Sequence, residues 1–80
     1  MLPIILRLPA VLSANGKSRS SQYSDIEQGL FTRPVRIGLR SVGWPSSEVA
    51  AINAARIAGK SDDEIRALVK KLEADRKAAI

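Results

Sequence analysis

The stretch NGKSRSS, residues 15–21, separates two short helical patterns and decides the fold. Residues 9–15 are predicted to form a helix that Gly16 ends, because glycine readily adopts the left-handed conformation found at helix C-termini. Ser18 can cap a second helix over residues 19–28, since its hydroxyl can accept a hydrogen bond from a free N–H of the first turn. Two helices joined by a tight turn within about 20 residues have the layout of a helix-turn-helix.

The second predicted helix has an apolar stripe and a polar face. Tyr23, Ile26 and Leu30 recur at i, i+3 and i+7, which predicts that they face the core. Small and polar side chains occupy the opposite face: Arg19, Ser20, Ser21, Gln22, Ser24 and Asp25. Tyr23, Phe31 and Trp44 could stack on single-stranded nucleic acid only if they were exposed and adjacent. Because the core of so short a chain is small, we expect these three aromatic residues to form its centre instead.

Residues 35–44 have the alternation of a two-stranded hairpin. Apolar residues recur at every second position in both halves of this segment, as expected for strands with one buried face. A tight loop over residues 38–41 joins the two halves. This ribbon is expected to carry Arg40 near its tip and Arg36 on its flank.

Two further helices are predicted, over residues 46–58 and 62–79. Ser61 and Glu64 have the spacing of a capping box, which marks the start of the last helix. Its apolar stripe consists of Ile65, Leu68, Val69 and Leu72. This stripe can pack on the core of the same domain, which we favour, or on a second copy of the chain. We therefore expect a domain over residues 1–60 and an amphipathic helix over residues 61–80 that packs on it or on a partner.

The composition argues against an enzyme. The 80 residues include no cysteine and no histidine, which excludes disulfides, thiol nucleophiles, imidazole bases and metal sites built on either residue. Asp62, Asp63 and Glu64 are explained by the start of a helix rather than by metal binding. We therefore expect no catalytic residue, metal, cofactor or small-molecule substrate.

The positive charge is concentrated in the first half of the chain. Thirteen Lys and Arg residues against eight Asp and Glu residues give a net charge of +5. Residues 1–44 hold six basic and two acidic residues, a net +4, whereas residues 45–80 hold seven and six, a net +1. This asymmetry places an anionic partner on the first half.

The N-terminal apolar run does not have the form of a targeting or membrane-spanning segment. It extends over residues 1–12 and is interrupted by Pro3 and Pro9. A membrane span needs about 20 apolar residues, and a signal peptide needs an uninterrupted apolar stretch behind a basic start. We therefore expect a cytoplasmic, nucleoid-associated protein with no membrane partner.

An ordered set of short segments resembles the AlpA family of prophage regulatory proteins. The segments are RLP with VL (residues 7–12), GKSRSS with Tyr23, Ile26, Gly29 and Phe31, PVRIG (residues 34–38), RSVGW (residues 40–44) and SEV (residues 47–49). The resemblance implies a winged helix-turn-helix related to excisionases and MerR-type regulators. Two positions depart from the family pattern: Gln22 replaces an aliphatic residue, and Ser24 replaces a frequent arginine.

The predicted fold class is therefore mainly helical with a small hairpin: a winged helix-turn-helix of about four helices and a two-stranded wing. Its expected DNA-binding residues lie on the start of the second helix and along the wing. They are Lys17, Ser18, Arg19, Ser20, Ser21, Gln22, Arg33, Arg36, Arg40 and Ser41. Arg19 is the best candidate for a bidentate contact to guanine. The alternative is that these residues form an ordinary solvated surface with no role in DNA binding.

The role of Arg7 stays open at this point, because it could contact a phosphate or form an ion pair with Asp25 or Glu27. The sequence predicts a protein that binds a specific double-stranded DNA site, and the resemblance implies regulation of prophage or mobile-element genes. One alternative is an excisionase-type protein that bends DNA, and another is an adaptor whose last helix docks on a protein. A homodimer or a cooperative oligomer on DNA is also possible.

Overall fold

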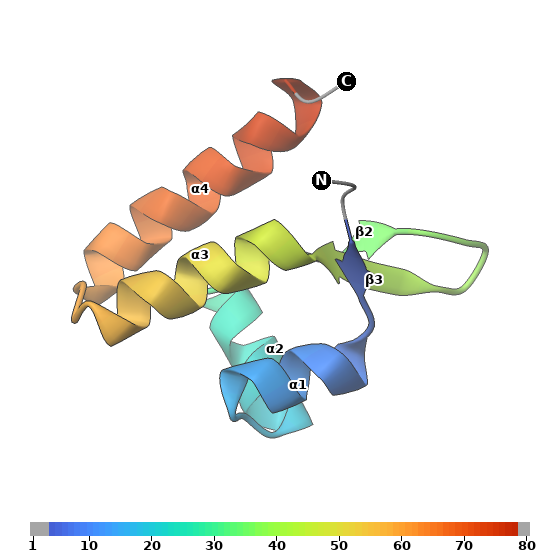
Figure 1. The fold of residues 1–80 in the computed structure, drawn as a ribbon, viewed down its shortest axis with the longest axis horizontal. Helices are drawn as coiled ribbons and strands as arrows, with labels where there is room; N and C mark the ends of the chain where they lie inside the picture. Colours follow the sequence, from blue (N-terminus) through green and yellow to red (C-terminus); the bar gives the residue numbers. More distant parts are fainter. Residues whose placement is uncertain (1–3, 79–80) are drawn as a thin grey trace.

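The computed structural model describes residues 4–78, which form four helices and, to one side of them, three short strands (Figure 1). The elements in chain order are β1 (Ile5–Leu6), α1 (Leu8–Asn15), α2 (Arg19–Glu27), β2 (Val35–Arg36), β3 (Val42–Pro45), α3 (Ser46–Ile57) and α4 (Asp62–Ala78). Each predicted helix is present with its ends within about one residue of the prediction, and position 79 of the last one lies outside the described residues. The mostly helical architecture with a small antiparallel sheet confirms the predicted fold class and is compatible with a winged helix-turn-helix. Among the described residues, no helix is both long and apolar enough to span a membrane.

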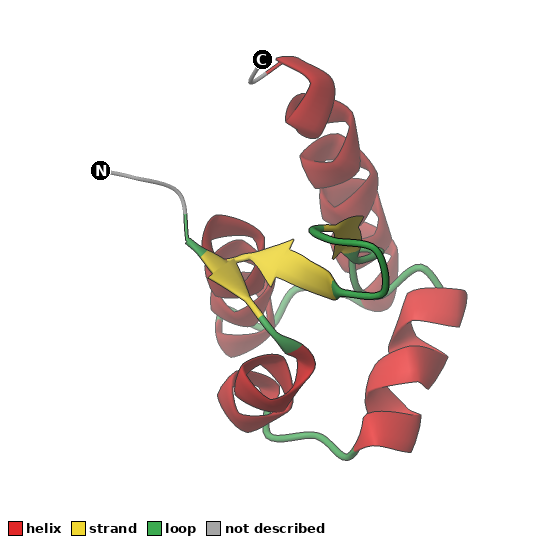
Figure 2. Ribbon diagram, turned by 90° about the vertical axis from the view of Figure 1, so that its right-hand side faces the viewer, coloured by secondary structure: helices red, strands yellow, loops and turns green. Residues whose placement is uncertain are grey.

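The sheet contains one strand more than the sequence predicts. Strands β2 and β3 form the expected antiparallel hairpin, and β1 pairs antiparallel with the other edge of β3 (Figure 2). Leu6 lies opposite Trp44, and Val35 lies opposite Gly43. A strand of two residues is too short to show an alternating pattern, so β1 could be recognised only from its pairing.

The core lies where the sheet meets α1, α3 and α4. Its buried apolar side chains are Val11, Leu30, Phe31, Trp44, Val49, Ile52, Ile65 and Val69. Trp44 is fully buried, and its indole N–H donates a hydrogen bond to the carbonyl of Thr32 at 2.9 Å. The rings of Phe31 and Trp44 lie 6.3 Å apart, within the range of favourable aromatic pairs. The predicted core positions of Phe31 and Trp44 are therefore confirmed.

Helix α4 packs on α3 and contributes to the same core. Ile65 and Val69 are buried, and Leu68 and Leu72 pack against them. The predicted capping box is confirmed: the Ser61 hydroxyl accepts from the N–H of Glu64 at 3.2 Å, and the Glu64 carboxylate accepts from the N–H of Ser61 at 3.0 Å. The hydrogen bond that the Glu64 carboxylate accepts from the backbone N–H of Ser61 lowers the pKa of Glu64, because it favours the ionised form.

The predicted inner face of α2 is confirmed only in part: Leu30 is buried and Ile26 packs against the core, but Tyr23 does not. Gln22 is fully buried and Asp25 is buried, whereas Tyr23 is 41% exposed. Gln22 and Asp25 are three residues apart, so they share the side of α2 that faces the rest of the domain. Polar partners there decide the outcome: the Asn15 side-chain amide donates to the Gln22 carbonyl at 2.8 Å, and Asp25 forms ion pairs with Lys17 and Arg56. A buried hydrogen-bonded face of this kind has no apolar periodicity by which the sequence could reveal it.

Candidate nucleic-acid interface

The start of α2 presents short polar side chains and an arginine to solvent. Gly16 has a φ of 65°, which lets the chain leave α1 and turn into α2. The Ser18 hydroxyl then accepts from the N–H of Ser21 at 3.2 Å, as the sequence predicts for a cap. Arg19, Ser20 and Ser21 are exposed. Within residues 4–78, no hydrogen bond or ion pair engages the Arg19 guanidinium, which is therefore available to an external acceptor.

Two residues assigned to this surface have their side chains engaged inside the domain. Gln22 is fully buried, and this finding corrects its predicted place on the exposed surface beside Arg19. The Lys17 ammonium forms an ion pair with Asp25, which also lies 3.6 Å from Arg56. Lys17 thus holds the turn against α2 and contributes less net charge to the surface than a free lysine would. We call the exposed residues 18–21 the α2 tip.

Of the two roles left open for Arg7, the ion pair with Asp25 or Glu27 is not formed in the part of the chain that the structure describes. Asp25 is shared by Lys17 and Arg56, and neither carboxylate pairs with Arg7 between residues 4 and 78. Arg7 is exposed at the start of α1. The phosphate contact that the sequence allowed for Arg7 stays a prediction.

The loop between β2 and β3 projects beyond the helices (Figure 1). The N–H of Ile37 donates to the carbonyl of Ser41 at 2.9 Å, which closes the loop over residues 38–40. The Arg36 guanidinium reaches back into this loop and donates to the carbonyls of Gly38 and Leu39 at 3.3 and 3.2 Å. Arg36 therefore braces the wing tip, whereas the exposed Arg40 has no such partner within residues 4–78.

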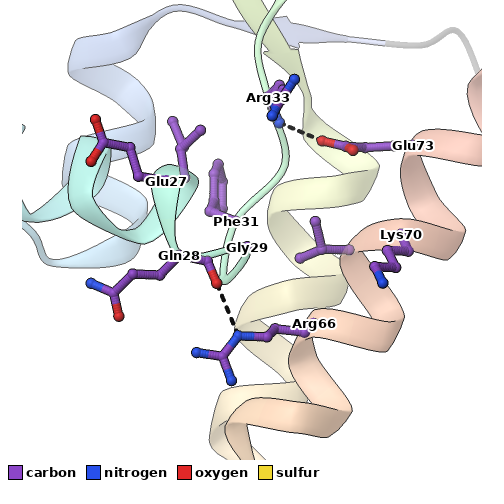
Figure 3. Close-up of a pocket in the computed structure, with 10 residues that line it drawn as sticks. Glu27, Gln28, Gly29, Phe31, Arg33, Arg66, Lys70 and Glu73 are labelled. Atoms are coloured by element: carbon purple, nitrogen blue, oxygen red, sulfur yellow. Dashed lines mark hydrogen bonds between the residues drawn. The ribbon is translucent and has the colours of Figure 1, made fainter.

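The base of the wing is held by α4. The N–H of Arg33 donates to the Glu73 carboxylate at 2.8 Å (Figure 3). The Arg33 carbonyl accepts from the Arg76 guanidinium at 2.6 Å. Arg76 also donates two hydrogen bonds, of 2.7 and 2.6 Å, to the carboxylate of Glu48, which is only 4% exposed. These bonds raise the pKa of Arg76. With its main chain held, Arg33 has an exposed position beside the wing.

Sequence reasoning missed this role of Glu48, Glu73 and Arg76. The contacting residues are 28 to 43 positions apart in the chain, and no local pattern pairs charges at that separation. The only signal was the fading of the apolar stripe after Leu72. Beyond Leu72, Glu73 and Arg76 contact the wing base and the first turn of α3.

A pocket of about 340 Å³ lies between the end of α2 and α4. Figure 3 shows side chains of both charges around it, including Glu27, Arg66 and Lys70. The Arg66 guanidinium donates to the carbonyl of Gln28 at 2.9 Å and so ties α4 to the end of α2. Because side chains of both charges line it, this pocket is part of a polar interface between the end of α2 and α4.

The segment from α2 to α3 has only one sign of charge. Residues 28–47 contain Arg33, Arg36 and Arg40 and no acidic residue. This segment lies between the α2 tip and α3 in the chain, and it includes the projecting wing. The arrangement provides an exposed polar helix start and a cationic ribbon on one small domain.

The sequence profile described as prophage CP4-57 regulatory protein (AlpA) matches residues 4–56 of this chain. The chain belongs to the AlpA family. An uncharacterized protein, ORF88 of Enterobacteria phage P4, is 46% identical over 55 residues, which are 69% of this chain and 62% of the relative. The chain thus spans less than two-thirds of the length of that relative. No solved structure matches this chain.

The AlpA match covers the helix-turn-helix, the wing and nearly all of α3, and it ends before α4. AlpA proteins are prophage regulators by description, which assigns this chain to a regulatory family rather than to a family of enzymes. In this AlpA-family protein, α4 supplies the side chains that hold the wing base, although it lies outside the matched residues.

Proposed function

We propose that this AlpA-family protein regulates prophage or mobile-element genes by binding a specific site on double-stranded DNA. The α2 tip would enter the major groove, and the wing would contact the adjacent groove or the backbone. The observation that carries this proposal is the α2 tip itself, a capped helix start with exposed serines and an unengaged Arg19. The family description supports the regulatory part.

The chemistry of the α2 tip suits base edges in a major groove. Serine side chains are short enough to let a helix approach the bases, and arginine can donate two hydrogen bonds to the O6 and N7 atoms of guanine. The free N–H groups of the first turn also favour a phosphate near Ser18. We assign sequence preference to Arg19, with Ser20 and Ser21 beside it.

The wing supplies charge rather than base recognition in this proposal. Arg40 is exposed at the tip and Arg33 at the base, and both can neutralise phosphates. Arg36 is occupied by two loop carbonyls, so its role is to shape the wing. If about four phosphates are contacted, log K should fall with log salt with a slope of about −3.6.

The test begins with selection of preferred sites from a library of random duplexes, followed by fluorescence anisotropy on the selected duplex and on a scrambled one at two salt concentrations. We expect Arg19→Ala to lower the preference for the selected duplex, because loss of a bidentate pair costs about 1–3 kcal/mol of discrimination. Arg40→Ala should weaken binding to both duplexes by a similar factor. Lys71→Ala serves as a charge-matched control on α4, where Lys71 is exposed beside Asp75.

Equal losses on both duplexes for Arg19→Ala would refute the assigned division of roles. Absence of any salt-sensitive duplex binding would refute DNA binding and favour a protein-interaction adaptor. The burial of Ile65 and Val69 weighs against that adaptor, because the apolar face of α4 already packs inside the domain.

A further inference from the structure

The wing tip carries a large apolar side chain that the rest of the described chain leaves uncovered. Leu39 is 85% exposed. It belongs to the loop between β2 and β3, which projects beyond the helices (Figure 1). It stands between Gly38, which adds no side chain of its own, and the exposed Arg40. Because Leu39 is exposed on a protruding loop, its whole side chain is available for contact with a binding partner of the wing.

The tip is braced rather than loosely attached. The Arg36 guanidinium donates to the carbonyls of Gly38 and Leu39, and the N–H of Ile37 donates to the carbonyl of Ser41. Because the loop carbonyls turn inward toward Arg36, the loop is organised around its own backbone. Leu39 is consequently presented outward by a short, hydrogen-bonded hairpin.

The charge around Leu39 identifies the kind of partner. Residues 28–47 include three arginines and no acidic residue, so an anionic surface is favoured and a basic one is repelled. The partner must also offer an apolar space for a leucine. A gap between two stacked base pairs has both properties, because phosphates line its edges and base faces line its interior.

We propose that the wing inserts Leu39 between two base pairs from the minor groove and kinks the duplex there, with Arg40 on the flanking phosphates. This proposal rests on the proposed DNA binding and adds a deformation to it. Leucine is one of the side chains that act as such wedges, and the resulting kinks range over roughly 20–90°. Arg36 is a positioning residue in this scheme, since it holds the loop that presents the wedge.

Unstacking has a cost that depends on the sequence, so the wedge also predicts a preference. Pyrimidine–purine steps such as TA and CA are the easiest to unstack. Preferred sites should therefore contain such a step on the side of the site that the wing contacts, at a position without a major-groove contact. Leu39 would in this way select sequence through the flexibility of DNA.

The experiment uses the duplex selected above, with 2-aminopurine placed at each pyrimidine–purine step in turn and a donor and acceptor dye at its ends. With the wild-type protein, we expect 2-aminopurine fluorescence to rise at one step and energy transfer to rise because the ends approach. Leu39→Ala should abolish both changes and lower affinity about tenfold. Leu39→Met, which keeps a long apolar side chain, should restore most of both.

Two further variants separate the wedge from general effects. Ile57→Ala removes an equally exposed apolar side chain, 87% exposed at the end of α3, and should leave both signals unchanged. Arg36→Lys keeps the charge but loses the fork that holds two carbonyls, so it should reduce the 2-aminopurine signal more than it reduces affinity. Circular dichroism verifies that each variant retains its helices.

The outcomes distinguish this proposal from the one on which it rests. If the wild-type protein binds no duplex, both are overturned. If it binds with the expected salt dependence but Leu39→Ala leaves the fluorescence and the energy transfer unchanged, only the wedge is overturned. A Leu39→Ala variant that changes self-association in analytical ultracentrifugation while both DNA signals persist would assign the tip to contacts between two copies, which also overturns the wedge.

Discussion

Helices α4 and α2 are both attached to the same core, but they present different chemistry to it. Helix α4 buries Ile65 and Val69, as its apolar stripe predicts. Helix α2 buries Gln22 and Asp25 and leaves Tyr23 at the surface. On α2 the stripe correctly places Ile26 and Leu30 against the core, but it does not reveal the positions that hydrogen bonds and ion pairs hold there.

The polar face of α2 joins three elements. Asn15 at the end of α1 donates to Gln22, and Asp25 lies between Lys17 of the turn and Arg56 of α3. The contacts are directional, so they set the angle at which the α2 tip leaves the domain. Within residues 4–78, no protein acceptor lies within hydrogen-bond distance of the Gln22 side-chain N–H group.

The largest loss of stability should come from a substitution in the apolar face of α4. Ile65→Ala opens a cavity in the buried apolar core, and we expect it to lower the free energy of unfolding by about 2–5 kcal/mol. Tyr23→Ala on α2 is the control and should cost less than about 1 kcal/mol, because Tyr23 is a surface side chain. Urea denaturation followed by circular dichroism measures both. Equal costs would mean that Tyr23 belongs to the core.

The second effect concerns the charged end of α4. Arg76→Ala leaves Glu48 buried without its partner and removes the donor to the Arg33 carbonyl. Breaking a buried pair costs about 3–5 kcal/mol, and the partial exposure of Arg76 reduces our expectation to about 2 kcal/mol. Lys71→Ala removes an exposed pair with Asp75 and should cost less than about 0.5 kcal/mol. A loss for Arg76→Ala as small as that for Lys71→Ala would show that α4 does not hold the wing base.

A smaller effect is expected on the polar side of α2. Gln22→Leu keeps the side-chain volume, removes the N–H group that lacks an acceptor, and leaves the half-buried Asn15 amide without its acceptor. These changes oppose one another, so the free energy of unfolding should change by less than about 1 kcal/mol in either direction. The same urea titration measures it. A loss of several kcal/mol would mean that the Asn15–Gln22 hydrogen bond is essential to the helix-turn-helix.

The smallest effect lies at the start of α4, outside the core. Its capping box lowers the pKa of Glu64 in the folded protein, so the ionised carboxylate stabilises the fold at neutral pH. This contribution is lost as the pH falls through the lowered pKa. Glu64→Gln should therefore have a lower Tm than the wild type at pH 7, and the two Tm values should converge in acid. A constant difference across the pH range would contradict a role for the ionised group.

Local physics allowed much of this molecule to be predicted. The left-handed Gly16, the cap at Ser18, the capping box of Ser61 with Glu64 and the stripe of α4 depend on residues within one or two turns of each other. The exposed α2 tip and the projecting Arg40 follow from the same local patterns. Proximity in sequence is sufficient for these features, because the interacting groups meet as soon as the helix or hairpin forms.

Tertiary structure alone decided the remainder. The pairing of β1 with β3, the burial of Gln22 and Asp25, and the hold of α4 on the Arg33 backbone each join segments that are distant in the chain. A polar side chain carries no mark of whether it will meet water or a buried partner, since either satisfies its hydrogen bonds. Packing brings those partners together and so determines which of the charged and amide side chains stay free to bind.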